Sequence, residues 1–127
     1  MPRVQHIDHV AIAVSDLERS KAWYEQHLGL KHRFADLWEG APVMMGAGDT
    51  AVALFEAEDA AARNPTPGWM LHLAFRVDRA GFLEGRGELA AAGIEVREVE
   101  HENCRSLYFK DPDGHQLELT TYEIEGL

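Results

Sequence analysis

The chain of 127 residues contains one cysteine, Cys104. A single cysteine excludes an internal disulfide and fits a reducing compartment. Long apolar runs are missing as well, because no stretch approaches the roughly 20 residues that cross a bilayer. The first residues, MPRVQHIDH, lack the charged start and apolar middle of a secretory signal. We therefore expect a cytoplasmic protein with no membrane partner.

Positive charge is also scarce. The chain has 12 lysines and arginines against 22 aspartates and glutamates, which gives a formal net charge of −10. Nucleic acids and anionic membranes select for basic patches, so this balance argues against both as partners. The length fits one domain with a real hydrophobic core. Histidine, by contrast, is abundant, with seven residues. That number justifies a search for a metal site.

The first half of the chain predicts one strand, one helix and three shorter strands. Residues 4–14 alternate and are rich in β-branched side chains, which is typical of a strand. Ser15 and Glu18 have the spacing of a capping box, and Gly29 follows the helix pattern that ends at Leu28. Further strands are expected near residues 30–36, 42–46 and 50–56.

The second half predicts the same order. A strand is expected over 70–77, a helix over about 78–92 that ends at Gly93, a strand over 94–99, and a final hairpin. The hairpin joins the alternating runs 106–109 and 116–120 through a turn, Asp-Pro-Asp-Gly, at 111–114. If this turn is centred near Asp113, Tyr108 and Glu118 lie opposite each other on the polar side of the hairpin.

The two halves also match as a repeat. A shift of 63 residues places His9 on His72 and Ala11 on Ala74, and each half ends in a Gly/Asp turn and a last strand. We therefore predict an α+β fold of two βαβββ modules. The single domain, 1–127, would comprise module one over about 1–57, a linker over about 58–68, and module two over about 69–127.

Three motifs in this order, DHVAIAVSDLERSKAWYEQHLGL, LHLAFRV and SLYFKDPDGHQLEL, resemble the vicinal oxygen chelate superfamily. That superfamily includes glyoxalase I, type I extradiol dioxygenases, fosfomycin-resistance proteins and bleomycin-binding (bleomycin-resistance) proteins. The resemblance implies a cupped, half-barrel sheet around a divalent metal, with helices on the outside. It implies His9, His72 and Glu118 as metal ligands, a small-molecule substrate with vicinal oxygens, and a homodimer.

The residue types support this ligand set independently. Two neutral imidazoles and one carboxylate on one side of a metal leave open positions, an arrangement associated with non-haem Fe(II) oxygenases. A bound divalent ion can hold two substrate oxygens and stabilise the charge that develops on them. Fe(II) or Mn(II) is therefore the favoured cofactor, and Ni(II) or Zn(II) would suit a glyoxalase-like enzyme.

A fourth ligand would separate the subfamilies, since the resemblance gives glyoxalase I a glutamate from the last strand of module one. When the repeat is used to find the residue of module one that is equivalent to Glu118, the position falls between Leu54 and Glu56, and the alignment of the motifs favours Leu54. Glu56 is a possible ligand only if the register slips. Its simpler interpretation is a solvated side chain at a strand end, which weakens the isomerase hypothesis.

Tyr108 and His101 are the candidate catalytic residues. The resemblance to extradiol dioxygenases implies that Tyr108, ten residues before Glu118, contacts substrate oxygens, and that His101 transfers a proton. His101 departs from the usual spacing by a couple of residues. Ser106 and Tyr108 do not decide alone, since fosfomycin-resistance proteins can carry a similar Ser-x-Tyr run.

Three functions follow from these residues. The first is an extradiol-type ring-cleaving dioxygenase. The alternative is a glyoxalase I-like lyase or a fosfomycin-resistance-like thiol transferase or epoxide hydrolase, and the third is a metal-free drug-binding protein like those of bleomycin resistance.

His115, in the turn, is expected to be exposed. Apolar side chains could line a pocket over the metal or form ordinary core: Phe34, Trp38, Met44, Met45 and Trp69.

Overall fold

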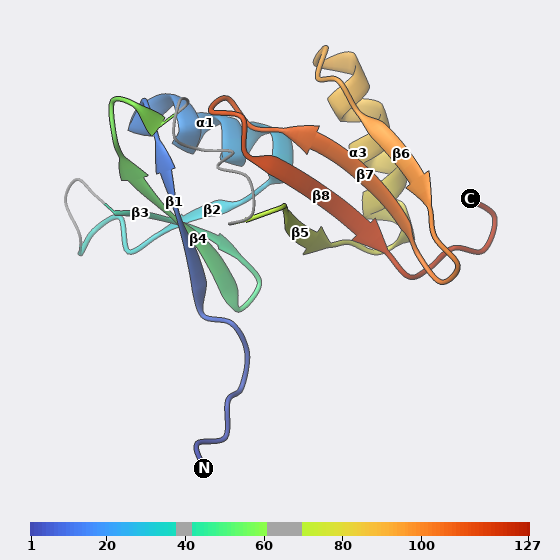
Figure 1. Ribbon diagram of the computed structural model, residues 1–127, viewed down its shortest axis with the longest axis horizontal. Helices are drawn as coiled ribbons and strands as arrows, with labels where there is room; N and C mark the ends of the chain where they lie inside the picture. The colour runs from blue at the N-terminus through green and yellow to red at the C-terminus, as the bar shows by residue number, and fades with distance from the viewer. Residues whose placement is uncertain (38–41, 61–69) are drawn as a thin grey trace. The chain divides into compact units, whose positions relative to one another are not determined.

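The computed structural model describes residues 1–37, 42–60 and 70–127. The chain divides into two compact units, Met1–Ala62 and Arg63–Leu127. Each unit contains a four-stranded mixed sheet with a helix, as Figure 1 shows. The α+β class and the βαβββ order of each half are therefore confirmed. No helix within the described parts of the chain is both long and apolar enough to span a membrane.

The first unit starts with strand β1, His9–Val14, and helix α1, Leu17–Leu28. Three strands follow: β2, Lys31–Arg33; β3, Val43–Ala47; and β4, Thr50–Glu56. Their order across the sheet is β1-β4-β3-β2, with β1 parallel to β4 and the other pairs antiparallel. The last strand of the unit therefore lies beside the first.

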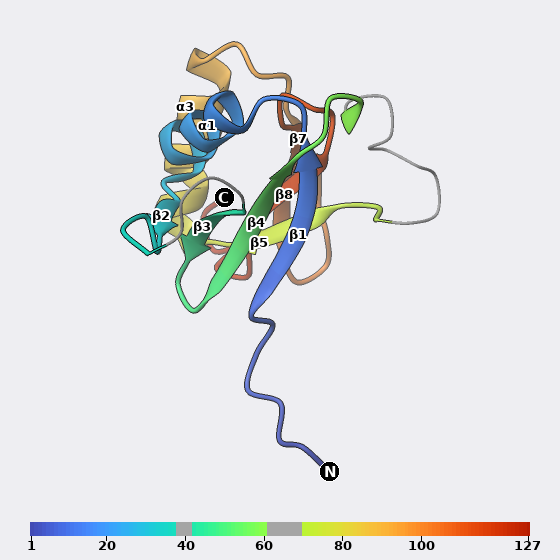
Figure 2. The same cartoon turned by 90° about the vertical axis from the view of Figure 1, so that its left-hand side faces the viewer.

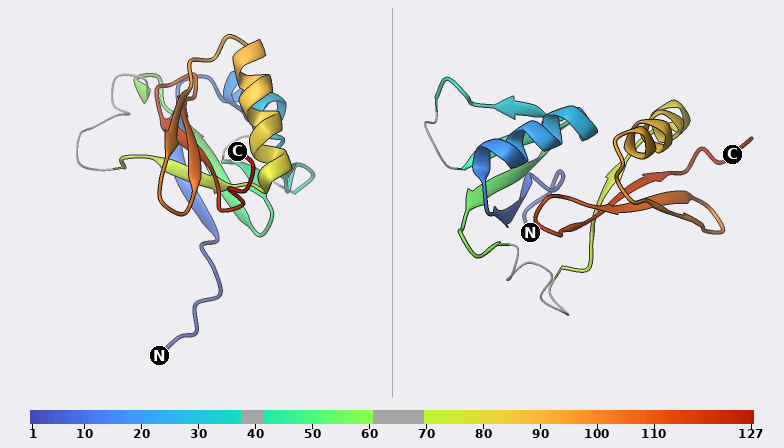
Figure 3. Two further views of the ribbon diagram at one scale, coloured as in Figure 1. Left: turned by 90° about the vertical axis from the view of Figure 1, so that its right-hand side faces the viewer. Right: turned by 90° about the horizontal axis from the view of Figure 1, so that it is seen from above.

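The second unit repeats this topology. Strand β5, Leu73–Arg76, is followed by helix α3, Arg79–Ala91. The remaining strands are β6, Arg97–Glu100; β7, Arg105–Lys110; and β8, Gln116–Thr121. The sheet order is β5-β8-β7-β6, with β5 parallel to β8. Figure 3 shows α3 along one face of this sheet.

Each sheet packs one face against its helix. In the first unit the buried side chains include Ile12, Val14 and Leu54, and α1 contacts β3 and β4 (Figure 2). In the second unit Leu107, Phe109, Leu117 and Leu119 are buried, as the alternation of the hairpin predicts. The opposite face of the second sheet carries polar side chains, and we call it the polar face. It includes His72, Arg97, Ser106, Tyr108, Glu118 and Thr120.

The start of α1 differs from the prediction. The N-cap is Asp16, whose Oδ1 accepts a hydrogen bond of 3.0 Å from the backbone N–H of Arg19, so the cap lies one residue later than Ser15. The end is as predicted, because Gly29 adopts a left-handed φ of 65°. The predicted first strand is shorter than 4–14, since β1 begins at His9, where its pairing with β4 begins at Ala51.

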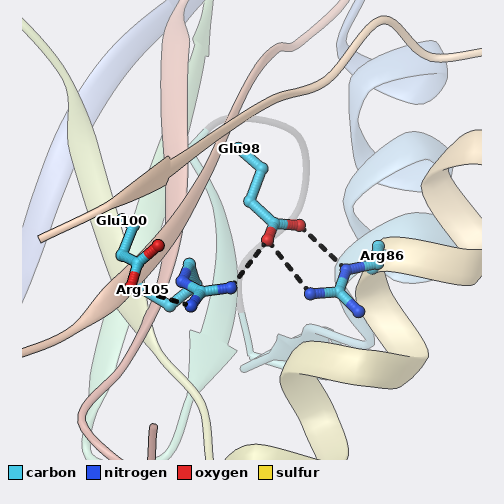
Figure 4. Close-up of polar contacts among 4 residues, drawn as sticks. All are labelled: Arg86, Glu98, Glu100 and Arg105. Carbon is cyan, nitrogen blue, oxygen red and sulfur yellow. Dashed lines mark hydrogen bonds and ion pairs between the residues drawn. The ribbon is translucent and has the colours of Figure 1, made fainter. Parts of the chain in front are cut away.

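An ion-pair network joins α3 to the edge of the second sheet (Figure 4). Arg86 of α3 donates to both carboxylate oxygens of Glu98, at 2.8 and 3.0 Å. Arg105 of β7 donates to the same carboxylate at 3.0 Å and lies 3.5 Å from Glu100. The Arg86 hydrogen bond, and after it that of Arg105, lowers the pKa of the Glu98 carboxyl below its ordinary 4.5.

The burial of several side chains can be compared with what the sequence predicts. His115 was expected to be exposed, but it is buried, with 6% of its surface accessible, and its backbone N–H donates a hydrogen bond of 2.9 Å to Oδ1 of Asp111 within the turn. Met44 and Met45 belong to the core, whereas Phe34 is 45% exposed. Trp38, Trp69 and most of the predicted linker, 58–68, lie outside the described residues. The predicted boundaries of the modules stay predictions.

Candidate functional site

Register places three polar side chains, of Arg97, Tyr108 and Glu118, in one row across the second sheet. Tyr108 is the partner of Glu118 in the β7–β8 pair, as the hairpin predicts. Arg97 of β6 is the partner of Tyr108, and Ala74 of β5 is the partner of Glu118. Because neighbouring strands lie about 4.8 Å apart, the row is compact. Guanidinium, phenol and carboxylate therefore stand side by side, and alanine leaves space beside the carboxylate.

His72 joins this row at Glu118. Its Nε2 lies 3.2 Å from Oε1 of Glu118, and the two side chains are 43% and 9% exposed, respectively. The His72 ring also meets the ring of Tyr108 edge-on, with 5.9 Å between centroids. The structure thus brings two of the three predicted metal ligands together, one buried and one accessible.

Tyr108 is held between charged neighbours. Burial, and after it the negative charge of Glu118, raises the pKa of the Tyr108 phenol above its ordinary 10.0. The phenol therefore remains a proton donor at neutral pH. His101, in the turn between β6 and β7, has its Nε2 3.5 Å from the Tyr108 hydroxyl. The two predicted catalytic residues are neighbours across a long contact.

Arg97 lies over the Tyr108 ring, with its guanidinium carbon 4.8 Å from the ring centroid. A stacked guanidinium keeps its N–H edges available for a planar anion. Arg97 and Tyr108 line a groove of about 440 Å³ together with Lys110, Gln116 and Glu95. Two cations, Arg97 and Lys110, and one carboxylate, Glu95, therefore line this groove.

His9 lies in the first unit, at the start of β1. Its Nδ1 is 2.8 Å from Oδ2 of Asp8. An ionised carboxylate can only accept, so Nδ1 carries a proton, and in the neutral form of the ring the lone pair lies on Nε2. This carboxylate–imidazole pair is the arrangement that commonly orients a metal-binding histidine.

The first unit has no carboxylate at the position equivalent to Glu118. Ala74 pairs with Glu118, and its repeat partner Ala11 pairs with Ala53, so Ala53 rather than Leu54 is the equivalent residue. Ala53 forms a buried apolar cluster with Met44 and Ala51. Glu56 lies three residues farther along β4, and its Oε1 accepts a hydrogen bond of 3.2 Å from the backbone N–H of Leu17. Its carboxylate is therefore placed at the start of α1.

The spacing within the His72–Glu118 pair fits a divalent metal. Two donor atoms that are each about 2.1 Å from an ion, at a right angle, lie about 3.0 Å apart. The observed separation of 3.2 Å is close to this value. Among residues 1–37, 42–60 and 70–127, no three or more His, Cys, Asp or Glu side chains converge on one point. His9 belongs to the other unit, so the triad stays a prediction.

Two residues of interest were absent from the sequence-based predictions. Arg97 carries a positive charge over the ring of Tyr108, and Asp8 carries a negative charge beside His9, its neighbour in the sequence. The register of β6 against β7, which places Arg97 beside Tyr108, could have been found by extending the hairpin pattern by one strand.

Comparison with known proteins places this geometry in a family. Residues 6–119 match the model of the glyoxalase/bleomycin resistance protein/dioxygenase superfamily. A glutathione transferase, FosA, from Serratia marcescens is 32% identical over 116 residues, which cover 91% of this chain and 80% of that protein. The metallothiol transferase FosB of Lysinibacillus sphaericus is 30% identical over 96% of this chain and 86% of that protein. A biphenyl-2,3-diol 1,2-dioxygenase of Rhodococcus globerulus is 33% identical, but the match covers 60% of its length.

Solved structures agree with this assignment. The fosfomycin resistance protein FosX from Mesorhizobium loti superimposes with a TM-score of 0.70 at 25% identity, over 94% of this chain and 93% of that protein. A glyoxalase/bleomycin resistance protein/dioxygenase domain from a Frankia species reaches a TM-score of 0.78 at 24% identity, over 98% and 96%, and supports the fold alone. The chain therefore belongs to the glyoxalase/bleomycin resistance protein/dioxygenase superfamily.

Proposed function

We propose that this chain is a divalent-metal-dependent enzyme that opens a small, oxygen-rich substrate by adding a thiol or water. The observation that carries the proposal is the row of Arg97, Tyr108 and Glu118, with His72 3.2 Å from the carboxylate. The relatives named as thiol transferases and as a fosfomycin resistance protein support this chemistry over ring cleavage. They favour the alternative over our first expectation of an extradiol dioxygenase.

The proposed metal ligands are His9, His72 and Glu118. A divalent ion bound there would act as a Lewis acid on substrate oxygens. Glu56 is not included, because its carboxylate already accepts from the first turn of α1. A homodimer stays a prediction of the resemblance.

The remaining residues of the row have distinct roles in the proposal. In an epoxide opening, the thiol sulfur forms a bond to carbon while a carbon–oxygen bond breaks, and the released oxygen takes up the proton that the thiol gives up. Tyr108 keeps its proton and can donate a hydrogen bond to that oxygen, with His101 at 3.5 Å as its exchange partner. Arg97, with Lys110 in the same groove, would hold an anionic group of the substrate.

The direct test combines metal content with turnover. The protein, purified without chelator, is assayed for bound metal and then loaded with Mn(II), Fe(II), Ni(II) or Zn(II). Fosfomycin, a small epoxide with a phosphonate, is supplied with glutathione, cysteine or water, and products are followed by phosphorus NMR. We expect His72→Ala and Glu118→Gln to lose both metal and turnover. His6→Ala, which changes a histidine of the N-terminal segment, is the matched control and should keep both.

A second candidate function is ring cleavage of a catechol, favoured by the tyrosine beside Glu118 and by the dioxygenase relative. It predicts oxygen uptake and a yellow product from catechols with the Fe(II)-loaded protein. Oxygen uptake without any thiol or water addition would replace the first proposal with this one. Metal content that does not depend on His72 would refute both.

A further inference from the structure

Ser106 makes a short polar contact on the polar face. Its hydroxyl donates to Oε2 of Glu118 at 2.6 Å, the length of a charge-assisted hydrogen bond to a carboxylate. Ser106 is fully buried, and Glu118 is 7% exposed. The contact is therefore shielded from water, and its partners cannot readily exchange it for a solvent molecule.

The hydroxyl of Thr120 continues this contact. It lies 3.3 Å from the Ser106 oxygen. Because the carboxylate of Glu118 can only accept, the single hydroxyl proton of Ser106 points to Glu118, and Thr120 supplies the proton between the two hydroxyls. The result is a short chain from Thr120 through Ser106 to Glu118, in which each bond polarises the next.

The two oxygens of Glu118 thereby have different partners. Oε2 accepts from Ser106, and Oε1 lies 3.2 Å from Nε2 of His72. A carboxylate held at both oxygens cannot rotate without losing one contact. Because Oε2 is held by Ser106, it is Oε1 of Glu118 that faces His72.

The first unit provides an internal comparison. There the residue equivalent to Glu118 is Ala53, and the residue equivalent to Tyr108 is Met44, its partner in the β3–β4 pair. Two residues before Met44 lies Pro42, at the place that Ser106 has before Tyr108. The buried hydroxyl is thus found in the module that has the carboxylate and is missing from the module that lacks it.

We propose that Ser106 is a positioning residue, which holds Oε2 of Glu118 so that Oε1 alone is presented on the His72 side. The inference deepens the proposed function and rests on it for the metal, because a carboxylate held in this way offers one oxygen as a ligand. Outer partners of metal ligands commonly change metal affinity 10–100-fold when removed.

The test uses the full chain and three variants. Ser106→Ala removes the hydroxyl, and Ser106→Thr keeps it. Thr121→Val removes another fully buried hydroxyl, from the next residue of β8 on the opposite face, and is the matched control. The first measurement is the carbon-13 resonance of the Glu118 carboxyl in metal-free protein, assigned by its loss in Glu118→Gln. The second is Mn(II) affinity, measured by EPR titration.

We expect Ser106→Ala to shift the Glu118 resonance and to weaken Mn(II) binding by about 10- to 100-fold. Ser106→Thr should restore most of both, and Thr121→Val should leave both unchanged. A Ser106→Ala protein with the wild-type resonance and the wild-type affinity would overturn the inference. If the resonance shifts but wild-type protein binds no Mn(II), the proposed function fails while the role of Ser106 in orienting the carboxylate stands.

Discussion

Gly85 of α3 lies directly against Leu119 of β8. A Cβ atom at position 85 would come within 2.8 Å of Cδ1 of Leu119, closer than carbon atoms approach without displacement. The helix can therefore pack tightly on the sheet because this position has no side chain. Gly87, two residues later, has no neighbouring atom within 4 Å of such a Cβ, and it is exposed.

The two glycines predict opposite responses to alanine. Gly87→Ala should raise the free energy of unfolding by about 0.5–1 kcal/mol, because alanine restricts the unfolded chain and favours the helix. Gly85→Ala gains the same helix propensity but must displace Leu119, at a cost of about 1–3 kcal/mol. Chemical denaturation of both variants tests the contrast. An equal gain in stability at both positions would contradict the packing of α3 on β8.

The network around Glu98 predicts a dependence of stability on acid. Its pKa is lowered in the folded chain, first by Arg86, so its contribution is present above the unfolded value near 4.5 and is lost as pH falls through the folded value. Glu98→Gln should lower stability at pH 7 by about 1 kcal/mol, a modest amount because the carboxylate is 33% exposed and screened.

The matched control for this prediction is Glu100→Gln, which alters a carboxylate that is 78% exposed and 3.5 Å from Arg105. It should change stability by less than about 0.5 kcal/mol. Denaturation curves between pH 3 and pH 7 provide the measurement. The difference between wild type and Glu98→Gln should shrink below pH 4.5, and a difference that persists undiminished at pH 3 would rule out the carboxylate as its source.

Local patterns predicted much of this fold. Alternation in the hairpin was enough to place Tyr108 opposite Glu118, because strand period and turn length fix the register. Gly29 was identified as the end of α1 because a left-handed residue is needed there. The repeat of His9 in His72 predicted equivalent positions at the start of β1 and just before β5.

The missed features depend on contacts distant in sequence. Ser15 and Asp16 are both of a residue type that caps helices, so the sequence alone does not say that Asp16 accepts from the N–H of Arg19. Residues 4–8 have a strand-like pattern, but the pairing of β1 with β4 begins at His9 and Ala51, and β4 itself starts only one residue earlier, at Thr50. His115 is buried, and a turn motif alone does not reveal whether a side chain in it packs against the protein or faces solvent.

Substitution of Glu56 should change the stability of the fold without changing its affinity for metal. Because its carboxylate accepts from the N–H of Leu17, Glu56→Ala should lower the free energy of unfolding by about 1 kcal/mol through loss of a contact at the helix start. Mn(II) affinity should stay at the wild-type value, whereas Glu118→Ala should abolish it. A fall in Mn(II) affinity in Glu56→Ala would restore Glu56 as a fourth ligand.

The hydrogen bond from His9 to Asp8 predicts the tautomer of the neutral His9 ring. Its hydrogen bond to His9 is the main cause of the lowered pKa of the Asp8 carboxyl, and it places the imidazole proton on Nδ1. The backbone oxygen of Asp8 accepts from the N–H of Ala51 at 3.0 Å, so the residue is anchored beside β4. Asp8→Ala should shift the His9 tautomer toward a proton on Nε2, which is the more common form of an unconstrained imidazole.

Nitrogen-15 NMR of the His9 ring in metal-free protein measures this shift directly. If His9 is a metal ligand, Asp8→Ala should also weaken Mn(II) binding by about 10-fold, since the lone pair on Nε2 is no longer held ready. Asp8→Asn keeps an acceptor for the Nδ1 proton and should retain the wild-type tautomer. Asp49→Ala removes an exposed carboxylate from the β3–β4 turn and controls for net charge. An unchanged tautomer in Asp8→Ala would show that the exposed pair does not orient His9, because water would then satisfy Nδ1 equally well.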